Sequence, residues 1–230
     1  MKRHIKKLAA NKSWPILRRD NIFVTRPYPG GHSFDLGTSI NVILKDLLKL
    51  ASTSREAKKL LLGHEVCVDG VRRKEPKFLV GLFDVLTIAK TDSYYRISLN
   101  KKGRIFAIPI KKEEAGIKPC KIIGKKVLSG GKIQINLSDG KNILAEKGVY
   151  STGDTLMLSL PGNSIKKHLK MDKSMLIFLT GGKHTGETGT VKKIINDKIT
   201  YVNENGEMIE TLKKYAFVVG EEKPEVSLGR

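Results

Sequence analysis

The sequence of 230 residues is poor in cysteine and in aromatic residues: it has two Cys and one Trp, and Phe, Trp and Tyr make up 6%. Cys67 and Cys120 stand far apart and form no Cys-x-x-Cys pair. This excludes a disulfide framework and the cysteine spacing of a zinc site, so we expect two reduced thiols. The five histidines are scattered without metal-ligand spacing, and we expect neither a metal nor another cofactor.

Long apolar runs are also missing. The longest, Met175–Leu179, is far shorter than the roughly 20 residues that a transmembrane helix needs. The first residues, Met1–Leu8, are basic, but the apolar core of a signal peptide does not follow them. We therefore expect a cytoplasmic protein without a membrane partner.

Acidic residues are few relative to basic ones. Lys and Arg number 43 against 23 Asp and Glu, which gives a formal net charge of +20. Self-repulsion of this size disfavours a compact monomer, and binding to a polyanion such as RNA or DNA relieves it. The hydrophobic content of 40% is enough for the cores of two or three small domains.

The sequence shows no assembled catalytic constellation. Glu113-Glu114 and Glu221-Glu222 are adjacent pairs of the kind found on solvated faces. The glycine-rich segment Thr180–Gly189 has no Gly-Lys-Ser/Thr in register and leads into a strand, which excludes a Walker-type phosphate loop. We expect no enzymatic activity and no small-molecule substrate.

Ile40–Ile88 reads as a compact module of two helices and a hairpin. Apolar residues recur at spacings of three and four up to Ala51, which predicts a first helix. Thr53 and Glu56 have the spacing of a capping box at the start of a second helix. Gly63 is expected to end that helix.

A hairpin is expected after the second helix. Glu65–Val68 alternates like a strand, Asp69-Gly70 is a two-residue turn signal, and Asp84–Ile88 reads as a further strand. Basic side chains on the helix and the hairpin suit phosphate contacts, although a solvated basic face without a partner stays an alternative. These residues are Arg55, Lys58, Lys59, Arg72, Arg73 and Lys74.

Residues 1–35 are predicted to form an extended basic arm, with a short helix at Ile5–Ala10. Arg26–Gly31 contains two prolines and two glycines, which disfavour regular structure. Basic residues interleaved with rings suit a segment lying along RNA, disordered until bound; packing of Trp14 on the next domain is the alternative. The basic residues are Lys2, Arg3, Lys6, Lys7, Lys12, Arg18, Arg19 and Arg26.

From Tyr94 onward short strands alternate with glycine-containing turns, which favours a small, partly closed β domain and then a third β unit. Ile165–Leu169 is expected to form one or two helical turns. In the third unit, Thr180–Gly189 is either a plain barrel turn or a loop that also contacts RNA through Lys183 and His184.

Two motifs in this order resemble a known family. Thr53–Leu61 followed by Val66–Gly70 resembles the alpha-L RNA-binding motif of bacterial ribosomal protein four, some pseudouridine synthases and tyrosyl-tRNA synthetases. Gly182–Val191 resembles the KOW motif of ribosomal proteins and NusG-type factors. Behind the arm His4–Ala10 with Lys12-Ser13-Trp14, the combination resembles the archaeal and eukaryotic small-subunit ribosomal protein family "S four e". The short stretch after the KOW unit is similar to archaeal members.

The resemblance implies a structural protein of the small ribosomal subunit, with small-subunit rRNA and neighbouring ribosomal proteins as partners. Two other functions fit the sequence less well. An RNA-modifying enzyme needs a large catalytic domain, for which residues 95–220 leave too little chain. A translation or transcription factor that uses its KOW unit to bind protein leaves the basic arm unexplained.

The expected fold class is α+β and multidomain, with a helical-hairpin RNA-binding module followed by two small β-barrel-like domains. The expected parts are a basic arm at 1–38, an alpha-L type module at 39–93, a central β domain at 94–170, a KOW-containing SH3-like domain at 171–220 and a tail at 221–230.

Overall fold

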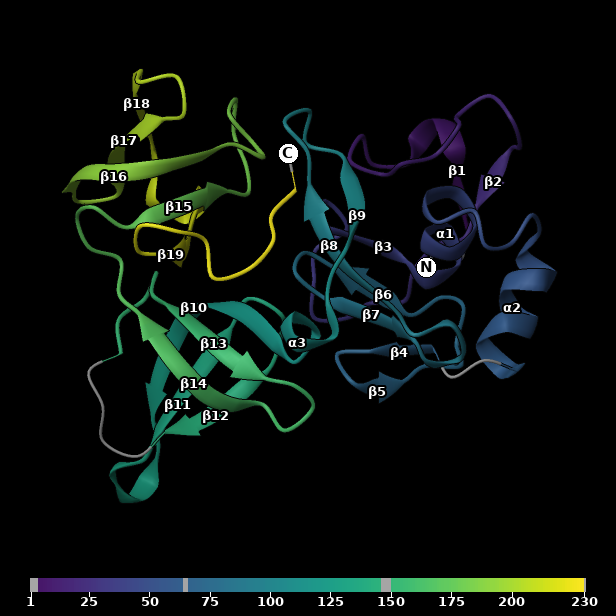
Figure 1. Ribbon diagram of the computed structural model, residues 1–230, viewed down its shortest axis with the longest axis horizontal. Helices are drawn as coiled ribbons and strands as arrows, with labels where there is room; N and C mark the ends of the chain where they lie inside the picture. Colours follow the sequence, from purple (N-terminus) through teal and green to yellow (C-terminus); the bar gives the residue numbers. More distant parts are fainter. Residues whose placement is uncertain (1–3, 64–65, 146–149, 230) are drawn as a thin grey trace. The chain divides into compact units, whose positions relative to one another are not determined.

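The computed structural model describes residues 4–63, 66–145 and 150–229. Its backbone is mostly β with few and short helices, so the expected α+β class is only a rough description. The chain divides into two compact units (Figure 1). Unit 1 comprises residues 1–99, 103–116 and 229, and unit 2 comprises residues 100–102, 117–228 and 230.

Unit 1 is built on a five-stranded sheet of order β5-β4-β7-β8-β9, with two short two-stranded sheets, β1-β2 and β3-β6. Its strands are β1 Ile5–Lys6, β2 Phe23–Val24, β3 Gly37–Ser39, β4 Val66–Val68, β5 Val71–Arg72, β6 Leu79–Gly81, β7 Val85–Ile88, β8 Ser93–Leu99 and β9 Ile105–Pro109. Its helical segments are η1 Lys7–Ala9, α1 Ile40–Val42, η2 Ile43–Leu47, α2 Ser54–Gly63, η3 Ala89–Thr91 and α3 Lys112–Ala115.

The first predicted helix is present but shorter than the apolar pattern indicated. It begins after Ser39, whose hydroxyl accepts from the backbone N–H of Val42, and changes to a π-helical turn at η2. Lys49 then has a φ of 54°, which ends the helix. Leu50 is therefore exposed. The apolar spacing predicted too long a helix because the spacing continues past Lys49, where the backbone leaves the helical conformation.

Strand pairing moves the first expected domain boundary. β8 pairs with β7 on one side and with β9 on the other, so both strands complete the sheet of unit 1. The expected boundary at 93/94 cuts this sheet, whereas unit 1 continues to residue 116 apart from residues 100–102. Arg96 of β8 is fully buried and forms an ion pair with Glu114 of α3, which fastens α3 to the sheet.

The N-terminal segment is folded rather than extended. β1 pairs with β2, and η1 replaces the helix expected at Ile5–Ala10. The buried indole of Trp14 donates to the carbonyls of Phe34 and Gly37 at 2.9 and 3.0 Å. The backbone N–H of Ile105 in β9 donates to the Ser13 carbonyl at 2.8 Å. Trp14 therefore packs against the following part of the chain, which was the alternative expectation. The expected disorder is wrong for the described residues 4–35.

Unit 2 contains two five-stranded sheets, of order β12-β11-β10-β13-β14 and β18-β17-β16-β15-β19. Its strands are β10 Ile117–Val127, β11 Ile133–Leu137, β12 Asn142–Ala145, β13 Thr155–Ser159, β14 Ser164–Leu169, β15 Leu176–Leu179, β16 Thr188–Ile195, β17 Lys198–Asn203, β18 Met208–Leu212 and β19 Ala216–Gly220. Its helical segments are the 3-10 turns η4 Ser129–Gly131 and η5 Lys213–Tyr215.

Most strands expected in unit 2 are present, with one error. The helical turn predicted at Ile165–Leu169 is strand β14, which pairs antiparallel with β13. Leu169 is buried on this strand while Lys166 and Lys167 are exposed. The core of the first sheet gathers apolar residues of β10, β11, β12 and β13: Cys120, Ile122, Ile135, Leu137, Ala145, Leu156 and Leu158.

One lysine ties the two sheets of unit 2 together. The ammonium of Lys121 in β10 donates to the carbonyls of Lys213, Lys214 and Ala216. Burial, with a smaller contribution from the charge of Lys213, lowers the pKa of Lys121 to about 8.

Candidate functional site

Helix α2 begins with the predicted capping box. The Glu56 carboxylate accepts from the backbone N–H of Ser52 at 2.8 Å and of Thr53 at 3.4 Å. The Thr53 hydroxyl accepts in return from the N–H of Glu56 at 3.2 Å. These bonds satisfy donors that the first turn of a helix leaves free. They also hold the pKa of Glu56 below its usual range, the bond from Ser52 being the largest cause.

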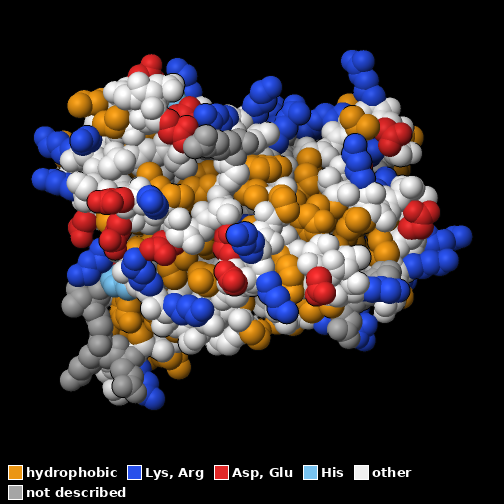
Figure 2. Space-filling model, viewed as in Figure 1, with side chains coloured by type: hydrophobic (Ala, Val, Ile, Leu, Met, Phe, Trp, Pro, Cys, Tyr) orange, Lys and Arg blue, Asp and Glu red, His pale blue; other side chains and the backbone are white. Residues whose placement is uncertain are grey.

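The same helix presents its cations to solvent. Ala57 and Leu61 are buried, while Arg55, Lys58 and Lys59 are all exposed. Arg55 and Lys59 are one helical turn apart and so lie on one face. Figure 2 shows the Lys and Arg side chains projecting over α2. The sequence prediction for these three residues is therefore consistent with their position.

The hairpin β4–β5 turns as predicted. Asp69 and Gly70 have φ values of 52° and 76°, which is the backbone of a type I′ turn. The backbone N–H of Asp69 donates to the Val85 carbonyl at 2.9 Å, and the Asp69 carboxylate accepts from the Val85 N–H at 3.1 Å. These bonds fix the hairpin on strand β7. Of the strand expected at Glu65–Val68, Glu65 lies outside the described residues.

A hydrogen bond joins the hairpin to α2. The guanidinium of Arg72 donates to the carbonyl of Leu62 in the last turn of the helix, at 3.2 Å. This satisfies a carbonyl that the helix end leaves free. It also brings exposed Arg72 and Lys74 to the C-terminal side of α2. We call Arg55, Lys58, Lys59, Arg72 and Lys74 the α2–hairpin surface.

Arg73, between these two, has a different environment. It is half-buried, and its guanidinium lies 4.3 Å from the centroid of the Phe78 ring. Such cation–π packing stabilises a basic side chain against its own domain. We therefore leave Arg73 out of the α2–hairpin surface, although its sequence neighbours belong to it.

Two basic residues of the N-terminal segment, both predicted to contact phosphate, make contacts within the chain. Lys7 is buried and pairs with Asp20 at 3.3 Å. The guanidinium of Arg18 donates to four backbone carbonyls within 3.3 Å and closes the loop between β1 and β2. These contacts engage part of the hydrogen-bonding capacity of each cation within the chain. The carbonyls are those of Lys7, Leu8, Ala10 and Asn11.

The other basic residues of this segment differ in exposure. Lys6, Lys12 and Arg19 are exposed, and Arg26 is half-buried. Lys2 and Arg3 lie outside the described residues. One pair was missed by the sequence: the ammonium of Lys77 lies 5.3 Å from the centroid of the half-exposed Tyr28 ring. The two are far apart in sequence, so no spacing could have revealed them.

The glycine-rich loop between β15 and β16 is ordered by its own hydrogen bonds. The Thr185 hydroxyl donates to the Gly182 carbonyl at 2.8 Å, and the Gly186 N–H donates to the Leu179 carbonyl at 2.8 Å. His184 is half-buried, with Nδ1 3.2 Å from the Glu187 carboxylate. Lys183 is exposed. Among the described residues of the loop, Lys183 is thus the exposed cation, whereas His184 is engaged within the loop.

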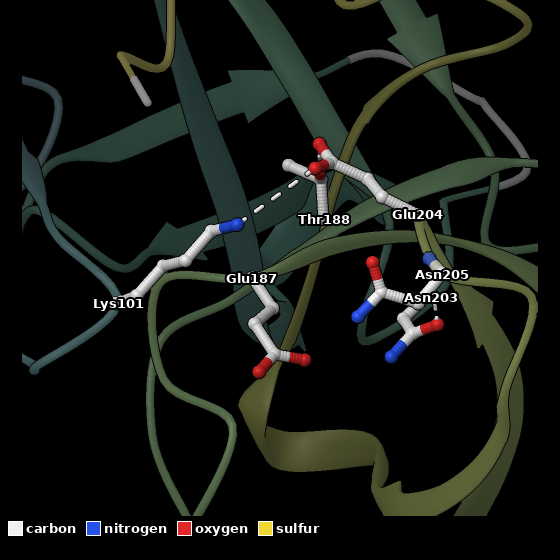
Figure 3. Close-up of a pocket in the computed structure, with 6 residues that line it drawn as sticks. All are labelled: Lys101, Glu187, Thr188, Asn203, Glu204 and Asn205. Atoms are coloured by element: carbon white, nitrogen blue, oxygen red, sulfur yellow. Dashed lines mark hydrogen bonds and ion pairs between the residues drawn. The ribbon is translucent and has the colours of Figure 1, made fainter.

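A small pocket lies at the base of this loop (Figure 3). It is lined by Lys101, Glu187, Thr188, Asn203, Glu204 and Asn205. Lys101 and Glu204 approach to 3.8 Å, and the Thr188 hydroxyl donates to Glu204 at 2.9 Å. Two carboxylates disfavour a phosphate group here by repulsion.

The positive charge is distributed unevenly along the chain. Residues 171–230 hold nine Lys and Arg and nine Asp and Glu, so the whole excess lies in residues 1–170. Figure 2 shows acidic side chains gathered over the region of β15 and β19. Over the described ranges, no group of three His, Cys, Asp or Glu residues is placed to hold a metal ion. In the same part of the chain no helix has the length and apolarity to cross a membrane.

Comparison with family profiles gives three matches along the chain. The Ribosomal family S4e profile matches residues 91–165, the S4 domain matches residues 40–86, and the RS4NT (NUC023) domain matches residues 1–35. The S4 match covers the two helices and the hairpin, where the alpha-L resemblance was noted.

Full-length relatives agree with these profiles. A protein named small ribosomal subunit protein eS4 from Methanococcus vannielii is 39% identical, with 99% of this chain and 98% of the relative covered. The protein of the same name from Methanocaldococcus jannaschii is 41% identical with the same coverage. The crystal structure of the 30S ribosomal protein S4e from Thermoplasma acidophilum superposes with a TM-score of 0.72 at 29% identity, covering 84% of this chain and 99% of that one. The chain therefore belongs to the ribosomal S4e family.

Proposed function

We propose that this protein is a structural constituent of the small ribosomal subunit that binds rRNA chiefly through the α2–hairpin surface. The observation that carries the proposal is the bond from Arg72 to the Leu62 carbonyl, which unites the cations of the helix and of the hairpin. Exposed Lys and Arg contacts to phosphates supply most of the affinity of such proteins. The carboxylate of Glu56, nearby in sequence, is occupied by backbone donors.

Other exposed cations add to this surface. Lys6, Lys12 and Arg19 of the N-terminal segment are proposed as further phosphate contacts, and Lys183 as an isolated one. The neutral charge of residues 171–230 supports a minor part in RNA binding for the loop between β15 and β16. The protein acts without a cofactor or a small-molecule substrate and performs no catalysis. Neighbouring ribosomal proteins are its other partners, in cytoplasmic ribosomes.

Binding of the full chain to fragments of small-subunit rRNA over a salt series tests the proposal. The triple variant Arg55→Ala, Lys58→Ala, Lys59→Ala should bind more weakly, with a salt slope smaller by about 0.7 to 0.9 for each lost contact. Its far-UV CD spectrum should be unchanged because the three residues are exposed. The matched control is Lys192→Ala with Lys193→Ala, which removes exposed lysines of β16. Equal weakening by the control would contradict a dedicated α2–hairpin surface.

Ribosome association requires a separate measurement. Tagged protein expressed in cells should sediment with small subunits in a sucrose gradient, and the triple variant should shift towards the free fractions. An RNA-modifying enzyme would remain mostly free, because it leaves its substrate after each turnover. Recovery of wild-type protein only at the top of the gradient would refute the structural role.

A further inference from the structure

Strand β18 forms an open edge of the C-terminal sheet. It is last in the order β18-β17-β16-β15-β19, so within the described part of the chain only one side of it is paired (Figure 1). Strand β19 at the opposite end is buried along all five residues. Of the two edge strands of this sheet, only β18 is therefore accessible over its length.

The register of the hairpin shows which backbone groups face outward. The Asn203 N–H donates to the Glu207 carbonyl, and the Lys213 N–H donates to the Asp197 carbonyl. Because bonded and non-bonded pairs alternate in antiparallel sheets, Ile209 and Thr211 direct their backbone groups towards β17. The backbone N–H and C=O groups of the residues between them point away from the sheet. These residues are Met208, Glu210 and Leu212.

The same three residues carry exposed side chains. Met208 is 74% exposed and Leu212 is 39% exposed, and Glu210 between them is exposed as well. Natural proteins usually protect an open edge with charges, proline or a bulge. Here the one charge on the strand, Glu210, is neutralised by Lys198 at 2.6 Å. The edge thus combines outward hydrogen-bonding groups with accessible apolar side chains.

The electrostatics of this edge indicate the sign of its partner. Glu204 and Glu207 lie exposed in the turn that leads into β18. These carboxylates repel phosphate and attract basic side chains. A strand partner must also supply N–H and C=O groups at peptide spacing, which a nucleic acid does not have. Both arguments favour a protein segment over RNA.

We propose that β18 accepts an extended basic segment of another protein as an added strand of the C-terminal sheet. Backbone hydrogen bonds to Met208, Glu210 and Leu212 provide the pairing, and lysine or arginine side chains near Glu204 and Glu207 provide the preference. This surface is separate from the α2–hairpin surface, and its partner is of a different chemical class.

The test measures binding of a synthetic peptide to the full chain. The probe has about ten residues, a common upper length for a strand, with lysine and valine alternating; a control peptide has glutamate in place of lysine. Glu210→Pro removes an outward N–H without removing a bond to β17, and Glu210→Thr removes the same charge while keeping that N–H. Comparing these two variants isolates the backbone contact from the charge.

We expect the lysine peptide to bind Glu210→Pro about tenfold more weakly than Glu210→Thr, which corresponds to one or two backbone hydrogen bonds. Glu204→Lys with Glu207→Lys should weaken the lysine peptide and strengthen the glutamate peptide. Affinity for rRNA should be the same in the two Glu210 variants, which carry the same charge, and this separates the surface from the proposed function.

A second probe leaves the protein unchanged. The lysine peptide methylated on every backbone nitrogen should bind wild-type protein at least about tenfold more weakly, because its strand donors are lost on both edges. Strand addition is overturned if the lysine peptide and its N-methylated form bind wild-type protein equally. It is also overturned if the lysine peptide binds Glu210→Pro and Glu210→Thr equally. A loss of rRNA affinity in Glu210→Pro, with peptide binding intact, would identify the edge as an RNA surface and also overturn the proposal.

Discussion

The carboxylate of Asp154 accepts a hydrogen bond from Nε2 of His168 at 2.8 Å. It also accepts from the backbone N–H of Ser151 and of Met171, both at 3.1 Å. One buried side chain thus joins the turn before β13 to the end of β14 and the segment after it. Three donors would lose their acceptor if this carboxylate were removed.

Asp154→Ala should therefore lower the free energy of unfolding of unit 2 by about 1 to 3 kcal/mol, the usual penalty for buried donors left unsatisfied. Hydrogen exchange under native conditions measures this effect separately for each unit. The control is Asp197→Ala, because Asp197 is exposed and its removal should change protection little. Equal protection of β13 and β14 in wild type and Asp154→Ala would refute the joining role.

The capping box predicts a dependence on acid pH. Hydrogen bonds lower the pKa of Glu56 in the folded state, so its stabilising contribution is complete above the unfolded pKa and disappears as the pH falls through the folded value. At neutral pH the backbone amides of α2 should be better protected from hydrogen exchange in wild-type protein than in Glu56→Gln. This difference should vanish in acid. A difference independent of pH would show that the charge is irrelevant.

Tyr201 should titrate late. Its side chain is buried, and burial together with the nearby Glu187 carboxylate raises its pKa to about 12. Because the folded state holds this proton more tightly, stability is lost as the pH rises from the ordinary tyrosine value towards about 12. Spectrophotometric titration should show a tyrosine that ionises above the ordinary tyrosine pKa, and Tyr201→Phe should remove this component. Tyr215→Phe serves as the control and should leave the late component in place.

The glycine-rich loop gives a pair of matched variants. Gly186 has a φ of 83°, and the Cβ of any larger residue there would clash with the backbone oxygen of Asn100. Gly186→Val should lower the stability of unit 2 by more than the roughly 1 to 2 kcal/mol of left-handed strain alone. Lys183→Ala should leave the melting temperature nearly unchanged because an exposed lysine contributes little to folding. If Gly186→Val melts like wild type, the loop is a permissive linker.

Local rules predicted the local structure well. The capping box of Thr53 and Glu56 and the turn at Asp69-Gly70 were confirmed because their hydrogen bonds lie within a few residues of sequence. Strand alternation also located most strands of unit 2, since one face of each is buried. The S four e resemblance was confirmed by the family comparisons.

What the sequence could not show depends on distant partners. Lys7 and Arg18 resemble surface cations in sequence, and only the fold shows that Asp20 and four carbonyls enclose them. Residues 165–169 carry two lysines that fit a helix face equally well, and pairing with β13 decides for a strand. The sequence also could not show that β8 and β9 join a sheet begun far upstream, across the expected boundary at 93/94.

The enclosure of Arg18 and the burial of Trp14 have a consequence for how the protein meets RNA. An arm that becomes ordered only on binding RNA would lose conformational entropy in the binding step and bury apolar area as it folds. Here the described part of the segment is folded in the free chain, so RNA would bind to a preformed protein surface. The heat-capacity change of association should then reflect the contact area alone, and association should proceed without a slow folding step.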